Sequence, residues 1–113
     1  MSTVELRNNV RELLLLLSSE KDQLTYESDV PHVDITVELM CMWFDDSYHP
    51  NSEVFRACFS QDELEVLEYF NAKYRKLSAL LPESKGTVKS WLNSPVWREV
   101  MSEAAIALTK IAA

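Results

Sequence analysis

The sequence predicts an all-α fold, a compact bundle of four to five helices in a single domain covering residues 1–113. The chain contains one glycine, Gly86, whereas tight hairpins and sandwich corners depend on glycine. Its 47% hydrophobic residues are typical of a globular domain, and 113 residues suffice for a core without a metal or a disulfide. Three segments also combine a helix start signal with apolar residues at helical spacing.

The first predicted helix covers residues 2–19. Its start has capping-box spacing, with Ser2 three residues before Glu5. One apolar stripe follows at helical intervals: Leu6, Val10, Leu13, Leu14 and Leu17. Residues 20–31 are polar and are predicted to form a connection.

Residues 33–46 fit two structures. Apolar residues alternate from Val33 to Trp43 as in a strand, but the opposite face also becomes apolar. Pro31 suits a first helical turn capped by Asp29, and this favours a helix. The alternative is a hairpin over residues 33–59, with residues 54–59 as the returning strand, which would make the fold α+β.

The clearest helix follows Ser60, which forms a capping box with Glu63. Its apolar face is predicted to comprise Leu64, Leu67, Phe70, Tyr74, Leu77 and Leu81, and Pro82 is expected to end it. Thr87 is predicted to cap a short turn. Ser94 and Pro95 then have the cap and first-position signals of a final helix, whose apolar face is Trp97, Val100, Met101, Ala104, Leu108 and Ile111.

Charge is distributed unevenly along the chain. Residues 20–68 hold 13 carboxylates against Lys21 and Arg56, a net charge of −11, whereas the remaining residues carry +4 and the whole chain −7. Such a surface repels nucleic acid and anionic membranes and attracts basic partners. Some of these acids belong to helix starts, notably Asp62, Glu63 and Glu65.

Asp45, Asp46 and His49 form the one plausible chemical cluster. On a continuous helix Asp45 and His49 would share a face, and a carboxylate with an imidazole can bind a divalent metal or act as an acid–base pair. A metal needs three or four convergent ligands, however, and His32 lies on the far side of the apolar run. The favoured interpretation is therefore a helix end with solvated aspartates, with no metal site, cofactor or enzymatic activity. A small metal-dependent hydrolase using these three residues is the alternative.

Other chemistry has less support. Cys41 and Cys58 lie among apolar neighbours and are expected to be buried thiols in a reducing compartment. Glycine-rich phosphate-binding loops are absent. The longest apolar run, Leu13 to Leu17, is too short to span a membrane and lacks the pattern of a signal peptide, so the expected location is the cytoplasm. This run could also serve a regulatory or adaptor subunit as a docking surface, a third hypothesis.

Aromatic residues lie within the acidic block, at residues 43–50 with sequence WFDDSYHP. Trp and Tyr are favoured anchors at protein interfaces. This stretch, with the size and acidity of the chain, resembles the immunity proteins of bacterial toxin systems, including contact-dependent growth inhibition and nuclease bacteriocins. The resemblance implies a non-enzymatic inhibitor that binds the basic C-terminal domain of a toxin. The predicted partner-binding residues are Glu38, Trp43, Asp45, Asp46, Tyr48, His49 and Glu53.

Overall fold

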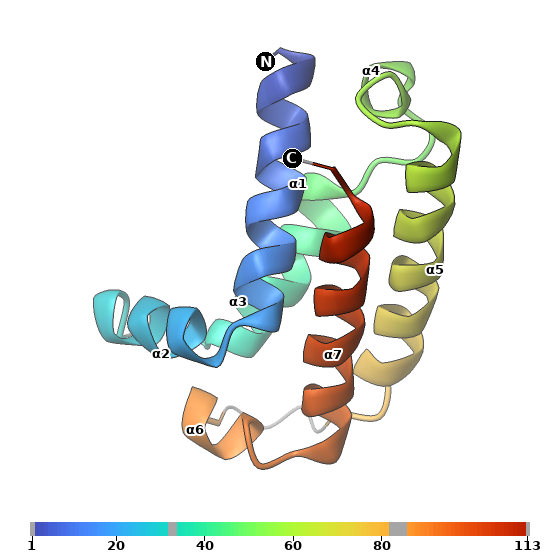
Figure 1. Ribbon diagram of the computed structural model, residues 1–113. Coiled ribbons are helices and arrows are strands. Elements are labelled where there is room, and N and C mark those ends of the chain that lie inside the picture. The colour runs from blue at the N-terminus through green and yellow to red at the C-terminus, as the bar shows by residue number, and fades with distance from the viewer. Residues whose placement is uncertain (1, 32–33, 82–85, 113) are drawn as a thin grey trace.

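The computed structural model describes residues 2–31, 34–81 and 86–112, and these residues form helices joined by short turns, with no strand among them (Figure 1). The predicted all-α class is therefore confirmed, and the hairpin alternative is wrong. Where four to five helices were expected, the described residues form seven α-helices and one π-helical segment. They are α1 (Thr3–Ser18), α2 (Glu20–Asp29), α3 (Ile35–Cys41), η1 (Met42–Ser47), α4 (Glu53–Arg56), α5 (Gln61–Ser78), α6 (Val88–Trp91) and α7 (Pro95–Lys110).

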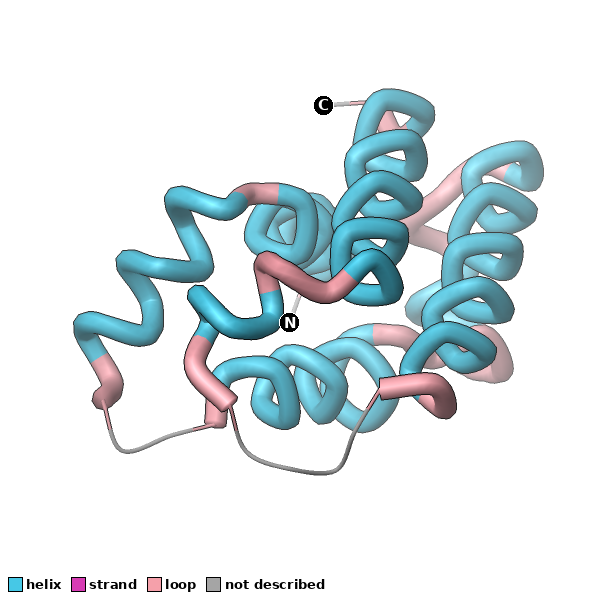
Figure 2. Tube along the Cα trace, turned by 90° about the horizontal axis from the view of Figure 1, so that it is seen from below, coloured by secondary structure: helices cyan, strands magenta, loops and turns pink. Residues whose placement is uncertain are grey.

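Three long helices and the continuous pair α3–η1 surround the core. α7 packs against both α1 and α5 and lies between them, and η1 packs against α1 (Figure 1). The short helices α2 and α6 contact each other near one end of the bundle, whereas α4 lies at the other end. Seen from below, α2 and α5 lie on opposite sides of the molecule (Figure 2).

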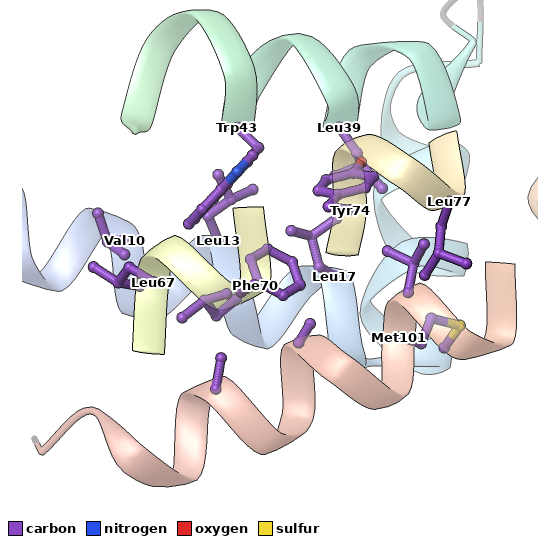
Figure 3. Close-up of a cluster of buried hydrophobic side chains, with 14 of the residues drawn as sticks. Val10, Leu13, Leu17, Leu39, Trp43, Leu67, Phe70, Tyr74, Leu77 and Met101 are labelled. Atoms are coloured by element: carbon purple, nitrogen blue, oxygen red, sulfur yellow. The ribbon is translucent and has the colours of Figure 1, made fainter. Parts of the chain in front are cut away.

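The predicted apolar faces point into this core (Figure 3). Leu14 and Leu17 of α1 are fully buried, as are Leu67 and Tyr74 of α5. Burying each leucine stabilises the fold by about 1.5–3 kcal/mol relative to exposure. Leu13, Leu14 and Leu17 fill the core and Leu16 packs against it, so Leu15, 48% exposed, is the residue of this run that remains for the docking surface of the adaptor hypothesis.

Residues 20–31 do not form the predicted connection, because most of them belong to α2. The Ser19 side chain accepts a hydrogen bond from the Asp22 amide at 3.1 Å and caps the helix. α2 is anchored by a buried polar side chain, Gln23, instead of an apolar stripe. Its Nε2 donates to the carbonyl oxygens of Leu16 and Leu17 at 3.0 Å each, so α2 closes the C-terminal end of α1.

The start of the next helix also differs from the prediction. Asp34 caps α3, because its Oδ1 accepts a hydrogen bond from the Val37 amide at 3.3 Å. Asp29 is the last residue of α2, and Pro31 lies before α3. His32 and Val33 lie outside the described residues. The predicted returning strand is instead mostly α4 and the turn after it.

The start signals of the later helices are confirmed. Ser60 and Glu63 form the predicted capping box of α5, with hydrogen bonds of 2.9 and 3.1 Å. Thr87 caps α6, and Ser94 caps α7 with Pro in its first turn. α5 ends at Ser78; Pro82, the predicted stop, lies outside the described residues.

An ion pair joins the segments at one end of the bundle. Arg7 of α1 donates to both carboxylate oxygens of Glu63 at 2.8 and 2.6 Å. The same guanidinium donates to the carbonyl oxygens of Cys58 and Ala112, and the Ala112 amide donates to Glu63 at 3.1 Å. The guanidinium hydrogen bond holds the pKa of Glu63 at about 2, below its usual 4.5. This cluster connects α1, the start of α5 and the residues after α7.

Candidate partner-binding surface

The predicted binding stretch, residues 43–50, covers most of η1 and the turn that follows it. A π-helix has i to i+5 hydrogen bonds, is rare, and frequently occurs at functional sites. Here the Tyr48 amide donates to the Trp43 carbonyl oxygen at 3.0 Å. At 3.6 residues per turn, side chains five apart would point about 140° away from each other. In the wider turn the two rings instead stack, with centroids 5.1 Å apart and planes at 8°.

Trp43 is fully buried, so its predicted role as a binding anchor is wrong. Its indole Nε1 donates to Asn71 Oδ1 of α5 at 3.1 Å, and its ring meets Phe70 edge-on. The indole therefore fixes η1 to α5 (Figure 3). Tyr48, stacked on it and only half-buried, is an aromatic residue of this stretch that a partner can reach.

The proposed chemical cluster does not assemble. η1 ends at Ser47 and Tyr48 is extended, so Asp45 and His49 do not share a helical face. The His49 ring instead lies 3.0 Å from the Asp46 carbonyl oxygen. Asp45 and Asp46 are exposed to solvent. Within the part of the chain that the structure describes, no group of three or more His, Cys, Asp or Glu residues could hold a metal ion.

The remaining predicted residues are dispersed around this stretch. Glu38 is half-buried in the first turn of α3, and Glu53 is exposed in the first turn of α4. Asp46 lines a shallow hollow between α1 and η1, together with Glu12. Tyr48 lines a different hollow, and the structure therefore does not bring all seven residues to one spot.

The Tyr48 hollow is formed between the turn after η1, α4 and the first half of α5. It has a volume of about 350 Å³. Its lining combines an aromatic ring with carboxylates, side-chain amides and one cation: Tyr48, Pro50, Arg56, Gln61, Leu64, Glu65, Glu68 and Asn71. We refer to the recess that these residues line as the Tyr48 hollow.

The electrostatics of this hollow favour a cationic ligand. Glu65 and Glu68 are exposed, and neither takes part in an ion pair among the described residues. Arg56 donates to the Pro50 carbonyl oxygen at 3.2 Å. Burial raises the pKa of Tyr48; the nearby Glu68 carboxylate raises it further and Arg56 opposes this. The phenol is therefore neutral at physiological pH and lies beside two carboxylates that form no ion pair in the part of the chain that the structure describes, although Arg56 lines the same hollow.

Glu65 and Glu68 are functional candidates that are not among the partner-binding residues predicted from the sequence. The sequence predicts Glu65 only as an acid near a helix start, and Glu68 only as part of the general acidic block. Their signal is a second periodic face of α5: Gln61, Glu65 and Glu68 follow one another at i, i+4 and i+7. Recognising this face as a site required Tyr48, whose position depends on the π-helical turn.

Comparison with protein-family models, with curated proteins and with solved structures found no match to this chain. No helix in the described ranges is long and apolar enough to cross a membrane. Evidence for function therefore comes from the geometry and charge of the surface itself.

Proposed function

We propose that this protein is a non-enzymatic inhibitor that binds a basic protein partner through the Tyr48 hollow and the acids around it. The observation that supports this most directly is the pair Glu65 and Glu68, which lie beside Tyr48 without an ion-pair partner among the described residues. A Lys or Arg side chain entering the hollow gains charge-assisted contacts to the carboxylates. The same cationic side chain can also contact the aromatic ring of Tyr48 in a cation–π interaction.

The acids beyond the hollow contribute to the rate of encounter. Asp45, Asp46 and Glu53 are exposed near the Tyr48 turn. Charges of one sign on such a surface steer an oppositely charged partner and raise its association rate. The partner class that fits best is the nuclease domain of a toxin, because the nucleic-acid-binding site of such a domain is basic. Covering that site would block the toxin, as immunity proteins do, and the same acidity disfavours direct binding to nucleic acid.

The test is binding to the C-terminal domain of a toxin encoded next to this protein's reading frame. We expect Glu65→Gln/Glu68→Gln to reduce the association rate about tenfold at low salt, because two steering carboxylates are lost. The difference should shrink when salt shortens the screening length to about 3–5 Å. Stopped-flow association and protection of cells that express the toxin are the two readouts.

The matched control is Asp22→Asn/Asp29→Asn, which removes two carboxylates from α2, on the far side of the molecule from α5 (Figures 1 and 2). This variant has the same net charge as the first but leaves the hollow intact. Equal rates for the two variants would mean that only net charge matters. Rates indifferent to salt and to both variants would contradict the proposed function.

A further inference from the structure

A second recess lies on the other side of Glu65, along the seam between α5 and α7. It has a volume of about 260 Å³. Its lining residues are Asp62, Glu65, Val66, Tyr69, Phe70, Glu103, Ile106, Ala107 and Lys110, which we call the α5–α7 groove. Because Glu65 lines both recesses, the groove and the Tyr48 hollow are adjacent parts of one surface.

Small and large side chains meet here without filling the seam. Ala107, buried and small, faces the seam from α7, and Phe70 closes it from α5. Tyr69 and Ile106 also line the groove and remain 59% and 45% exposed, respectively. One turn further along, Lys73 and Glu99 bridge the same two helices at 3.6 Å. The groove is therefore an apolar opening beside a closed stretch of the seam.

The charge around this opening is mainly negative. Asp62 and Glu65 line it from α5 and Glu103 from α7, whereas Lys110 is the cation among the lining residues. None of these three carboxylates forms an ion pair within the described ranges. An apolar recess with acids on both sides is complementary to an apolar side chain flanked by cations.

We propose that the α5–α7 groove binds an apolar side chain from a basic segment of the protein partner. This inference rests on the proposed function, because the same partner would place a Lys or Arg in the Tyr48 hollow. The groove adds specificity: the hollow selects charge, and the groove selects segments in which a Leu, Met or Phe lies next to the basic residues. A few side chains that fill well-packed, desolvated recesses contribute much of the affinity of protein interfaces.

Two synthetic peptides test this with the full-length protein. One has a central leucine between three lysines on each side, and the other has serine in place of the leucine. Binding is followed by NMR titration at low and at high salt. We expect the leucine peptide to bind at least fivefold more tightly, with the largest shifts at Val66, Ile106 and Ala107, and both peptides to weaken as salt is added.

Variants separate the groove from general charge. Tyr69→Ser/Ile106→Ser should abolish the preference for leucine while leaving the salt dependence unchanged. Val4→Ser/Leu80→Ser is the matched control, because these side chains are 66% and 65% exposed and lie outside the groove; it should keep the preference.

The outcomes distinguish the two proposals. If both peptides bound with equal affinity and that affinity fell with salt, the proposed role of the groove would be contradicted, whereas the proposal of a basic partner would stand. The absence of shifts with either peptide would also overturn the groove, whereas the toxin-binding experiment would still decide the proposed function. If the leucine peptide bound more tightly but its affinity changed neither with salt nor in Glu65→Gln, the basic residues beside the apolar side chain would not contribute. That result would contradict the proposed basic partner class.

Discussion

At the scale of single residues, the two cysteine thiols differ in exposure. Cys58 is buried, its Sγ donates to the Val54 carbonyl oxygen at 3.2 Å, and burial raises its pKa. Cys41 is exposed, which corrects the expectation that both thiols are buried. Because thiolate character and access govern thiol reactivity, we expect one fast and one slow reaction with a colorimetric thiol reagent at neutral pH.

Two single variants assign these reactions. Cys41→Ser should remove the fast phase, and Cys58→Ser should preserve it. In denaturant both thiols of the unmodified protein should react at similar rates. A fast phase that survives in Cys41→Ser would show that Cys58 is accessible.

Trp43 illustrates what the sequence could and could not predict about a residue. Its acidic neighbours made it a plausible anchor, while its apolar period made it a plausible core residue. Whether Trp43 is a surface anchor or a core residue depends on the width of one helical turn, because η1 directs the indole toward Asn71 and places Tyr48 against it. No local propensity rule predicts a π-turn, whereas the burial of Phe70 and Trp97 followed directly from their periodic positions.

At the scale of elements, α2 contains one buried residue, Gln23, whose amide is hydrogen-bonded on both sides. Gln23 donates to the carbonyl oxygens of Leu16 and Leu17, and its Oε1 accepts a hydrogen bond from Trp97 Nε1 at 3.0 Å. Gln23→Leu would remove this partner from the Leu17 carbonyl oxygen and the Trp97 indole N–H, whereas the Leu16 carbonyl oxygen keeps its hydrogen bond from the Ser19 amide. Each buried polar group left unsatisfied costs about 1–3 kcal/mol. We therefore expect a loss of about 3 kcal/mol in the free energy of unfolding, measured by urea denaturation.

The control for this variant is Thr25→Leu, an exposed position on the same helix. It should change the free energy of unfolding by less than about 0.5 kcal/mol. A similarly small change for Gln23→Leu would show that α2 is held to the bundle by other contacts.

The same element explains why the sequence prediction was incomplete. Three of the helix starts carry hydroxyl caps with periodic apolar residues behind them, and these were predicted correctly. α2 has no apolar stripe, and its polar residues matched a loop as well as a helix. α2 is held in place by tertiary hydrogen bonds to α1, α6 and α7, which a local pattern does not contain.

At the scale of the whole molecule, the Arg7–Glu63 cluster makes stability depend on pH. Glu63 has a pKa of about 2 when folded and 4.5 in its ordinary state. Its contribution is complete above about pH 5 and is lost as the pH falls from about 4.5 towards 2, because the unfolded chain then takes up the proton first. A shift of this size corresponds to about 3 kcal/mol, and both side chains are mostly shielded from solvent.

Glu63→Gln tests this linkage. We expect it to destabilise the protein by about 2–3 kcal/mol at pH 7, since the neutral Gln cannot form the ion pair with the Arg7 guanidinium and leaves that charge uncompensated. The variant and the parent should become similar in stability near pH 2. Urea unfolding at a series of pH values measures both effects. A constant difference between the two proteins across this range would contradict the assigned role of Glu63.

The pairing of α1 with α7 also has a consequence for biosynthesis. α1 is made early, yet it packs against α7, which follows it by more than seventy residues. At ribosomal speeds of about 5–20 residues per second, several seconds pass between the synthesis of α1 and the synthesis of α7. During this time the leucines of α1 lack the surface of α7 that later covers them. Nascent chains halted before α7 should therefore present those leucines to chaperones, and a release-dependent loss of chaperone crosslinking would record the moment of folding.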